Sequence, residues 1–166
     1  LFWSTTMKVY IGNDHGGYHM KMEIAEYLRK HGHEVTDVGS GSTDIVRYPY
    51  YAAEVARAVQ SGKADRGILI CSTGIGMSII ANKFKKVRAA VCTDTYCARM
   101  TRAHNNSNVL CLGGKVTGSA LAQDMVETWM TTEYEGGRHD ISLGLIEEAE
   151  DAMIGGAPWK ETGKRK

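Results

Sequence analysis

Short apolar runs that alternate with helix-like stretches are the feature of this sequence that most constrains its fold. Four continuous apolar runs have the length of strands that are covered on both faces, as in a parallel sheet. They lie at residues 9–11, 68–71, 89–92 and 109–112, and a weaker fifth lies at 34–38. The intervening stretches repeat apolar residues at helical spacing, as at Met20, Ile24, Tyr27 and Leu28.

The order of these stretches predicts the architecture. Helices are expected at 20–30, 52–59, 76–84, 94–103, 119–129 and 141–153, with Gly32 ending the first and Pro49 opening the second. Strand and helix alternate five times with short connections, which is typical of parallel sheets with right-handed crossovers. We therefore predict an α/β fold, a Rossmann-like doubly wound three-layer sandwich with a five-stranded parallel sheet and a C-terminal helix.

Composition and the chain ends narrow the class of protein. The formal charge is +1 and no apolar run approaches the roughly 18 residues of a membrane span, so neither nucleic acid nor a membrane is an expected partner. The four cysteines lack the spacing of a zinc site, which indicates free thiols in a reducing compartment, the cytoplasm. We expect residues 1–6 to be an extension or cloning remnant rather than a signal peptide, 7–153 to form a single domain, and 154–166 to be a flexible basic tail.

Function is expected in the loops that follow the strands, because doubly wound folds bind ligands outside the carboxyl ends of their strands. Asp14 and His15 are adjacent after the first strand, and the glycines behind them let the backbone approach a ligand. A capping aspartate beside a surface histidine is the alternative interpretation of this pair.

A glycine-containing turn follows the strand at 68–71 and leads into a helix. It reads Cys71-Ser72-Thr73-Gly74-Ile75-Gly76, and its backbone N–H groups predict a concave site for an anion or an enediolate. The spacing matches neither the Walker A nor the dinucleotide-binding fingerprint, which argues against a nucleotide. Cys71 ends the strand beside the helix start, where a thiol is suited to act as a base, and an inert buried thiol is the alternative.

Two further stretches carry polar side chains of interest. His104 and Asn105 precede the strand at 109–112, and Arg138 lies in a glycine-rich segment. Arginine suits the geometry of phosphate. A simple turn and a solvated surface arginine are the alternative interpretations of these two stretches.

Taken together and in this order, the motifs resemble those of the type B ribose-5-phosphate isomerases and the related galactose-6-phosphate isomerase subunits. The similarity extends from about Met7 to Glu150, and the matching stretches lie at 12–17, 48–49, 67–76, 81–83, 88–91, 98–100, 104–108 and 135–139. It implies an aldose–ketose isomerase of sugar phosphates, an intramolecular oxidoreductase that needs no metal or organic cofactor. The family also implies a homodimer whose active site is shared between the subunits, with a tetramer as the alternative.

The resemblance implies a role for each matching residue. Cys71 corresponds to the base that moves a proton between carbons 2 and 1 through a cis-enediol, Thr73 to a hydroxyl that shuttles the oxygen-bound proton, and His104 to the acid that opens the furanose ring. Asp14 corresponds to a residue that holds the substrate hydroxyls. The remaining substrate-binding positions, including backbone N–H groups that stabilise the enediolate, are His15, Ser72, Gly74, Ile75, Gly76, Asn105, Lys115 and Arg138.

Three positions depart from the pattern of a ribose-5-phosphate enzyme. Arg47 stands where the family usually has an acidic residue, Lys115 where it has an arginine, and Ser142 where it commonly has a second phosphate-binding arginine. Lys115 and Ser142 are expected to weaken phosphate binding by about 1–3 kcal/mol relative to two arginines. Arg47 is a candidate to replace the lost charge, and drift at a loop position is the alternative interpretation. We expect ribose 5-phosphate as the substrate, with erythrulose 4-phosphate, allose 6-phosphate or galactose 6-phosphate as alternatives.

Two other classes of function compete with this one. A non-catalytic sugar-phosphate-binding subunit is disfavoured by the intact set Asp14, Cys71, Thr73 and His104. A nucleotide-binding module is disfavoured because its phosphate-loop spacing and its ribose-binding acid are absent from the sequence.

Overall fold

A computed structural model describes residues 5–156 of the chain. They form two compact units, one that ends at Tyr134 and one that begins at Glu135. The expected extension at 1–6 and the expected tail at 154–166 lie largely outside the described residues. The expectation of a single domain over 7–153 stays a prediction.

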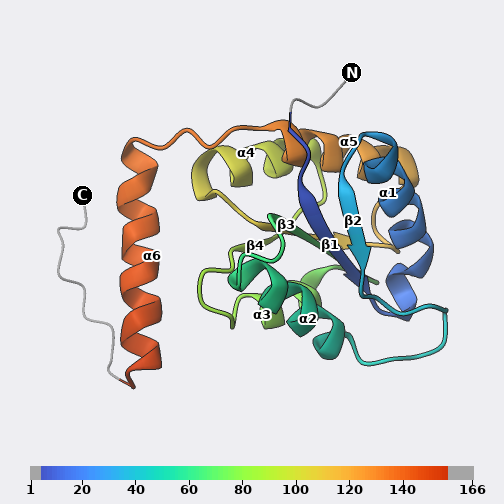
Figure 1. Cartoon of the computed structure of the whole chain (residues 1–166), viewed down its shortest axis with the longest axis horizontal. Coiled ribbons are helices and arrows are strands. Elements are labelled where there is room, and N and C mark those ends of the chain that lie inside the picture. Colours follow the sequence, from blue (N-terminus) through green and yellow to red (C-terminus); the bar gives the residue numbers. More distant parts are fainter. Residues whose placement is uncertain (1–4, 157–166) are drawn as a thin grey trace. The chain divides into compact units, whose positions relative to one another are not determined.

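The first unit is built on a five-stranded parallel sheet (Figure 1). Every neighbouring pair of strands is parallel, and the spatial order is β2-β1-β3-β5-β4. The predicted α/β class and the predicted five-stranded parallel sheet are therefore confirmed. The strands are β1 (Lys8–Asn13), β2 (Glu34–Asp37), β3 (Arg66–Cys71), β4 (Ala89–Val91) and β5 (Val109–Gly113).

Helices cover both faces of this sheet, which makes three layers. One core cluster joins a face of the sheet to α1 (Tyr18–Lys30), α4 (Thr95–Asn105) and α5 (Ser119–Thr131). A second cluster joins the opposite face to α2 (Tyr48–Gln60) and α3 (Ile75–Ala81).

Side chains of β3 divide between these two clusters, because successive residues of a strand point to opposite faces. Ile68 and Ile70 enter the cluster beneath α1, α4 and α5. Leu69 and Cys71 enter the cluster beneath α2 and α3. Cys71 therefore ends its strand on the side that α3 covers.

Several helix boundaries differ from the predicted ones by a few residues, and for two of them the structure gives the reason. α2 begins at Tyr48 instead of residue 52, because Pro49 belongs to the first turn, where a missing N–H costs nothing. α3 ends at Ala81 instead of residue 84. The Asn82 side chain accepts a hydrogen bond from the Ala89 N–H at 2.8 Å and donates one to the Ala89 C=O at 2.9 Å. These bonds tie the end of α3 to the start of β4.

The strand order places a switch point between β1 and β3. The connection through α1 leads from β1 to β2 on one side, whereas the connection through α3 leads from β3 to β4 on the other side. Ligands of doubly wound folds bind where neighbouring connections diverge in this way. The loops that begin at Asp14 and Ser72 flank this point.

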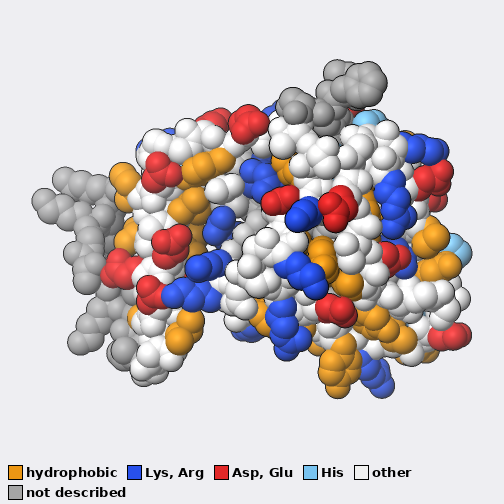
Figure 2. Space-filling view, viewed as in Figure 1, with side chains coloured by type: hydrophobic (Ala, Val, Ile, Leu, Met, Phe, Trp, Pro, Cys, Tyr) orange, Lys and Arg blue, Asp and Glu red, His pale blue; other side chains and the backbone are white. Residues whose placement is uncertain are grey.

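The second unit contains α6 (Arg138–Ile154), the predicted C-terminal helix, which has no buried residue. Apolar side chains on it are exposed, including Ile141 at 70% and Met153 at 69%. Acidic side chains gather in its last turns, and both kinds of side chain are visible in Figure 2. Exposed apolar surface of this kind is typical of protein interaction sites. None of the helices within residues 5–156 combines the length and the hydropathy needed to cross a membrane.

The buried His33 predicts how the stability of the fold depends on pH. His33 is 6% exposed, and its Nδ1 accepts a hydrogen bond from the Met7 N–H at 3.1 Å. Burial, with a smaller contribution from His31, lowers the pKa of His33 below its usual value. The unfolded chain therefore takes up a proton at a higher pH than the folded chain does. The free energy of unfolding is expected to fall as the pH drops below about 6.5.

Urea unfolding at about pH 7.5 and about pH 5.5 measures this contribution. The fall in unfolding free energy between these pH values is expected to be smaller in His33→Gln than in the wild type. His19→Gln, which changes an exposed histidine of α1, is expected to behave like the wild type. The same fall in all three proteins contradicts the assignment to His33.

Candidate active site

The loops after three neighbouring strands contact one another at the carboxyl edge of the sheet. The Asp14 N–H, after β1, donates a hydrogen bond to the Ile70 C=O of β3 at 3.2 Å. The Gly114 N–H, after β5, donates one to the Cys71 C=O at 2.8 Å. The predicted loop residues after β1, β3 and β5 therefore lie in one region of the molecule.

Cys71 is the last residue of β3 and stands at the entrance to the glycine turn. It is 6% exposed, and its Sγ accepts a hydrogen bond from the Gly74 N–H at 3.1 Å. Gly74 has a φ of 80° and caps α3, a left-handed conformation that glycine adopts without strain. The turn thus directs a backbone donor at the sulfur.

The other three cysteines have different surroundings. Burial raises the pKa of Cys92 to about 12 and raises the pKa of Cys111 well above its usual value. Cys97 is exposed, and a hydrogen bond with Asp94 raises the pKa of its thiol. These three thiols are neutral at neutral pH, and none of them occupies the switch point.

The rest of the turn presents hydroxyl and amide groups. Thr73 is exposed, and its Oγ1 accepts a hydrogen bond from the Ile75 N–H at 3.3 Å. The ring of Tyr48 lies over Gly76, where an added Cβ would come within 2.8 Å of it. The first residue of α2 therefore packs against this turn.

Ser72 lies between the loops of two other strands. Its C=O accepts a hydrogen bond from the Lys115 N–H at 3.1 Å. A Cβ added to Gly16 would sit 2.3 Å from Ser72 Oγ, so only glycine allows the β1 loop to approach this closely. Lys115 is exposed, and this contact keeps it beside the turn.

Asp14 and His15 line a cavity beside the turn. Asp14 is 5% exposed, and its Oδ1 accepts a hydrogen bond from the Gly16 N–H at 2.8 Å. The Nδ1 of His15 lies 4.0 Å from Asp14 Oδ2 and accepts a hydrogen bond from the Val46 N–H at 3.4 Å. With Nδ1 accepting, the neutral ring carries its proton on Nε2. The cavity has a volume of about 510 Å³, and the segment 45–50 forms its other wall.

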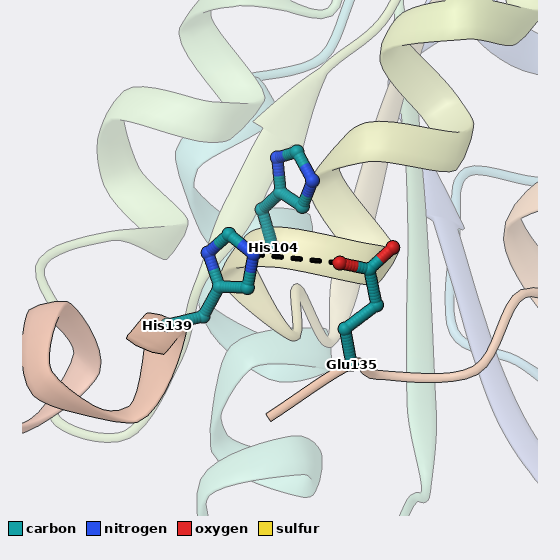
Figure 3. Close-up of side chains that lie close together, drawn as sticks. All are labelled: His104, Glu135 and His139. Carbon is teal, nitrogen blue, oxygen red and sulfur yellow. Dashed lines mark ion pairs between the residues drawn. The ribbon is translucent and has the colours of Figure 1, made fainter. Parts of the chain in front are cut away.

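His104 and Asn105 do not lie at this edge of the sheet. They form the end of α4, which returns to the amino edge and leads into β5 at Val109. Figure 3 shows His104 on the last turn of that helix. β5 spans five residues, so its amino end is about 16 Å from the carboxyl edge. The chain therefore does not bring its own His104 and Asn105 to its own Cys71.

Arg138 lies in the second unit, at the exposed start of α6. Next to it, His139 Nε2 lies 3.5 Å from Glu135 Oε2 (Figure 3). Ser142 follows Arg138 by one helical turn and shares its face of α6. The start of α6 therefore presents one guanidinium on this face, that of Arg138.

Most of the segment 45–50 was not predicted from the sequence to line the cavity. Ile45, Tyr48 and Tyr50 line it, and Ile45 and Tyr50 are each 78% exposed. The available signal was the gathering of large apolar side chains around Pro49 at a helix start, where core packing does not account for them.

Known proteins are similar to this chain in sequence and in fold. The family model described as Ribose/Galactose Isomerase matches residues 9–146. Ribose-5-phosphate isomerase B of Escherichia coli is 48% identical over 139 residues, which cover 84% of this chain and 93% of that protein. D-erythrulose-4-phosphate isomerase of Pectobacterium atrosepticum is 42% identical over 134 residues, which cover 79% of this chain and 87% of that protein. The solved structure of Clostridium thermocellum ribose-5-phosphate isomerase B is 52% identical, with a TM-score of 0.88 over 89% of this chain and 99% of that one.

The fold, the switch-point loops and these relatives agree on the class of protein, which is an isomerase of sugar phosphates. More narrowly, the chain belongs to the ribose/galactose isomerase family. The resemblance and the enzyme class that the sequence predicts are thereby confirmed.

Proposed function

We propose that this protein interconverts ribose 5-phosphate and ribulose 5-phosphate, with Cys71 as the base. The observation that carries the proposal is the place of Cys71 Sγ, at the switch point and 3.1 Å from the Gly74 nitrogen that donates to it. Removal of a proton next to a carbonyl needs a base and fixed donors for the resulting oxyanion. The relatives from Escherichia coli and Clostridium thermocellum, which are named for this reaction, support the choice of substrate.

The proposed reaction moves two protons within the open-chain sugar. The Cys71 thiolate takes the proton from carbon 2, and the electron pair shifts through the C1–C2 bond onto the carbonyl oxygen to give a cis-enediolate. Thr73 assists the transfer of the hydroxyl proton from O2 to O1, and Cys71 returns its proton to carbon 1. Amide donors of the turn 72–76 stabilise the oxygen charge, while Asp14 accepts hydrogen bonds from the other hydroxyls.

The complete site is proposed to need two subunits. His104, the proposed ring-opening acid, and its neighbour Asn105 end a helix at the sheet edge opposite to Cys71, so a second copy has to supply them. The exposed apolar side chains of α6 favour such an assembly. Arg138, at the start of that helix, is proposed to bind the phosphate with Lys115. The proposed assembly is a homodimer, and its pairing into a tetramer is the alternative.

Co-expression of Cys71→Ala and His104→Asn chains tests the shared site. Each variant alone is expected to have little activity, whereas a mixed dimer regains one intact site of its two. Random pairing is expected to restore about a quarter of the wild-type activity, because a twofold dimer carries two equivalent sites. Activity no higher than that of the separate variants contradicts a shared site.

Turnover assays in the presence of a chelator test the reaction and the substrate. Ribose 5-phosphate is expected to be converted at a rate that the chelator leaves unchanged. A rate abolished by the chelator contradicts the metal-free mechanism. A protein that binds sugar phosphates but converts none is a non-catalytic binding subunit.

D-erythrulose 4-phosphate is the second candidate substrate. Lys115 and Ser142 depart from the arginines expected in a ribose-5-phosphate enzyme, and the Pectobacterium atrosepticum relative is named for the four-carbon reaction. The ratio of kcat/KM for the two sugars decides between them, because it measures differential transition-state binding.

The cytoplasm is the proposed location. A thiolate base has to stay reduced, and the four cysteines of the described residues are free.

A further inference from the structure

Arg47 breaks a local rule of helix structure beside the proposed active site. It is the N-cap of α2, a position that favours Ser, Thr, Asp or Asn, and its side chain makes no capping hydrogen bond. A cation at this position also opposes the helix dipole. Arg47 therefore weakens the helix that it begins, and residues that do so without local compensation are expected at functional sites.

The charge of Arg47 is not neutralised within residues 5–156, where its side chain makes neither an ion pair nor a hydrogen bond. The residue is exposed and lines the cavity of about 510 Å³ together with Asp14 and His15. Of the residues that line this cavity, it is the one with a permanent positive charge. A cavity of this size accommodates a sugar phosphate.

The cavity combines one acceptor group with two donor groups. The Asp14 carboxylate accepts hydrogen bonds from hydroxyls and repels a phosphate. The Val46 N–H donates to His15 Nδ1 at 3.4 Å, which leaves Nε2–H as the free donor of the imidazole and ties His15 to the residue before Arg47. A guanidinium forms paired hydrogen bonds to phosphate oxygens. The Arg47 guanidinium and the His15 Nε2–H can therefore donate hydrogen bonds to the phosphate of a substrate whose hydroxyls contact Asp14.

We infer that Arg47 binds the phosphate of the substrate and determines which sugar phosphates this protein accepts. The inference rests on the proposed function. It also accounts for two weakened positions, because Lys115 lacks a bidentate donor and Ser142 carries no charge. Part of the phosphate binding therefore moves to the wall formed by residues 45–50.

Kinetics of Arg47→Ala, Arg47→Lys and Arg57→Ala test the inference. The measured quantities are KM and kcat for the sugar phosphate that the wild type converts best, and the inhibition constant of inorganic phosphate. Arg47→Ala is expected to raise KM and the phosphate inhibition constant together by about tenfold, and the effect on KM is expected to exceed that on kcat. Arg47→Lys keeps the charge and is expected to lie between Arg47→Ala and the wild type.

Arg57→Ala is the matched control because it removes a guanidinium from the other end of α2. That guanidinium lies over the ring of Phe84, 5.5 Å from its centroid, and outside the cavity. Its phosphate inhibition constant is expected to equal that of the wild type.

Three outcomes separate this inference from its competitors. An unchanged phosphate inhibition constant in Arg47→Ala overturns it. The inference is also overturned if Arg47→Ala sediments as a smaller particle than the wild type and its raised phosphate inhibition constant returns to the wild-type value at high protein concentration. That result assigns Arg47 to a contact between copies of the chain. The third outcome is a wild type that converts no sugar phosphate and yet binds inorganic phosphate in isothermal titration calorimetry, with the binding lost in Arg47→Ala. That result contradicts the proposed function and supports the phosphate site at Arg47.

Discussion

Replacing Cys71 with alanine is expected to lower kcat for the preferred sugar phosphate by at least about 100-fold, the scale of a lost general base. The proposed mechanism assigns the removal of the carbon 2 proton to this sulfur, which ends β3 at the switch point. The neighbouring Asp14 carboxylate, which accepts a hydrogen bond from the Gly16 N–H at 2.8 Å, is assigned to the substrate hydroxyls instead. KM is expected to change little, because the groups that hold the hydroxyls and the phosphate remain. Initial rates at saturating substrate measure the effect.

Cys92→Ala provides the matched control for this substitution. Cys92 is 2% exposed and follows β4, and burial raises its pKa to about 12, so it is a neutral thiol away from the switch point. Both substitutions remove one sulfur from a buried position and are expected to cost about 1 kcal/mol of stability. Only Cys71→Ala is expected to change kcat. A Cys71→Ala enzyme with nearly wild-type turnover removes this thiol as the base and, with it, the proposed mechanism.

The sheet could be predicted from the sequence because its central strands are buried on both faces. β3 and β5 consist almost entirely of buried residues, and they appear in the sequence as continuous apolar runs. β2 lies at an edge, has no fully buried residue, and showed the weakest pattern. The early end of α3 could not be seen, because it depends on bonds from the Asn82 side chain to the backbone of Ala89.

The candidate site could be predicted only where its residues are contiguous in the chain. Two such stretches follow a strand directly and can be recognised by their polar and glycine residues, namely Asp14 with His15 and the turn 71–76. The cavity wall at 45–50 reaches the site through a bond from Val46 to His15, which are 31 positions apart, and no local pattern reports that contact. His104 depended on the resemblance to a family, because its own chain places it at the other edge of the sheet.

Gly74→Ala is expected to lower both the stability and the turnover of the enzyme. Gly74 has a φ of 80°, a conformation that costs an alanine about 1–2 kcal/mol. An added Cβ would also lie 3.0 Å from the backbone of Leu112 in β5, which cannot move without disturbing the sheet. This contact is expected to cost about 1–3 kcal/mol more. Relief of the contact displaces the Gly74 N–H from Cys71 Sγ, and a shift of about 1 Å in a catalytic group lowers turnover by up to about 100-fold.

Gly62→Ala separates the backbone strain from the contact. Gly62 follows α2 with a φ of 76°, close to that of Gly74, but a Cβ added there meets no atom within 4 Å. Urea unfolding is therefore expected to show a loss of about 1–2 kcal/mol in Gly62→Ala, from the strain alone, and a larger loss in Gly74→Ala. Turnover per folded molecule is expected to fall in Gly74→Ala and to stay at the wild-type level in Gly62→Ala. If turnover survives Gly74→Ala while stability falls, the amide of Gly74 is not needed to hold the sulfur, and the donors for the enediolate charge have to be sought among the other N–H groups of the turn.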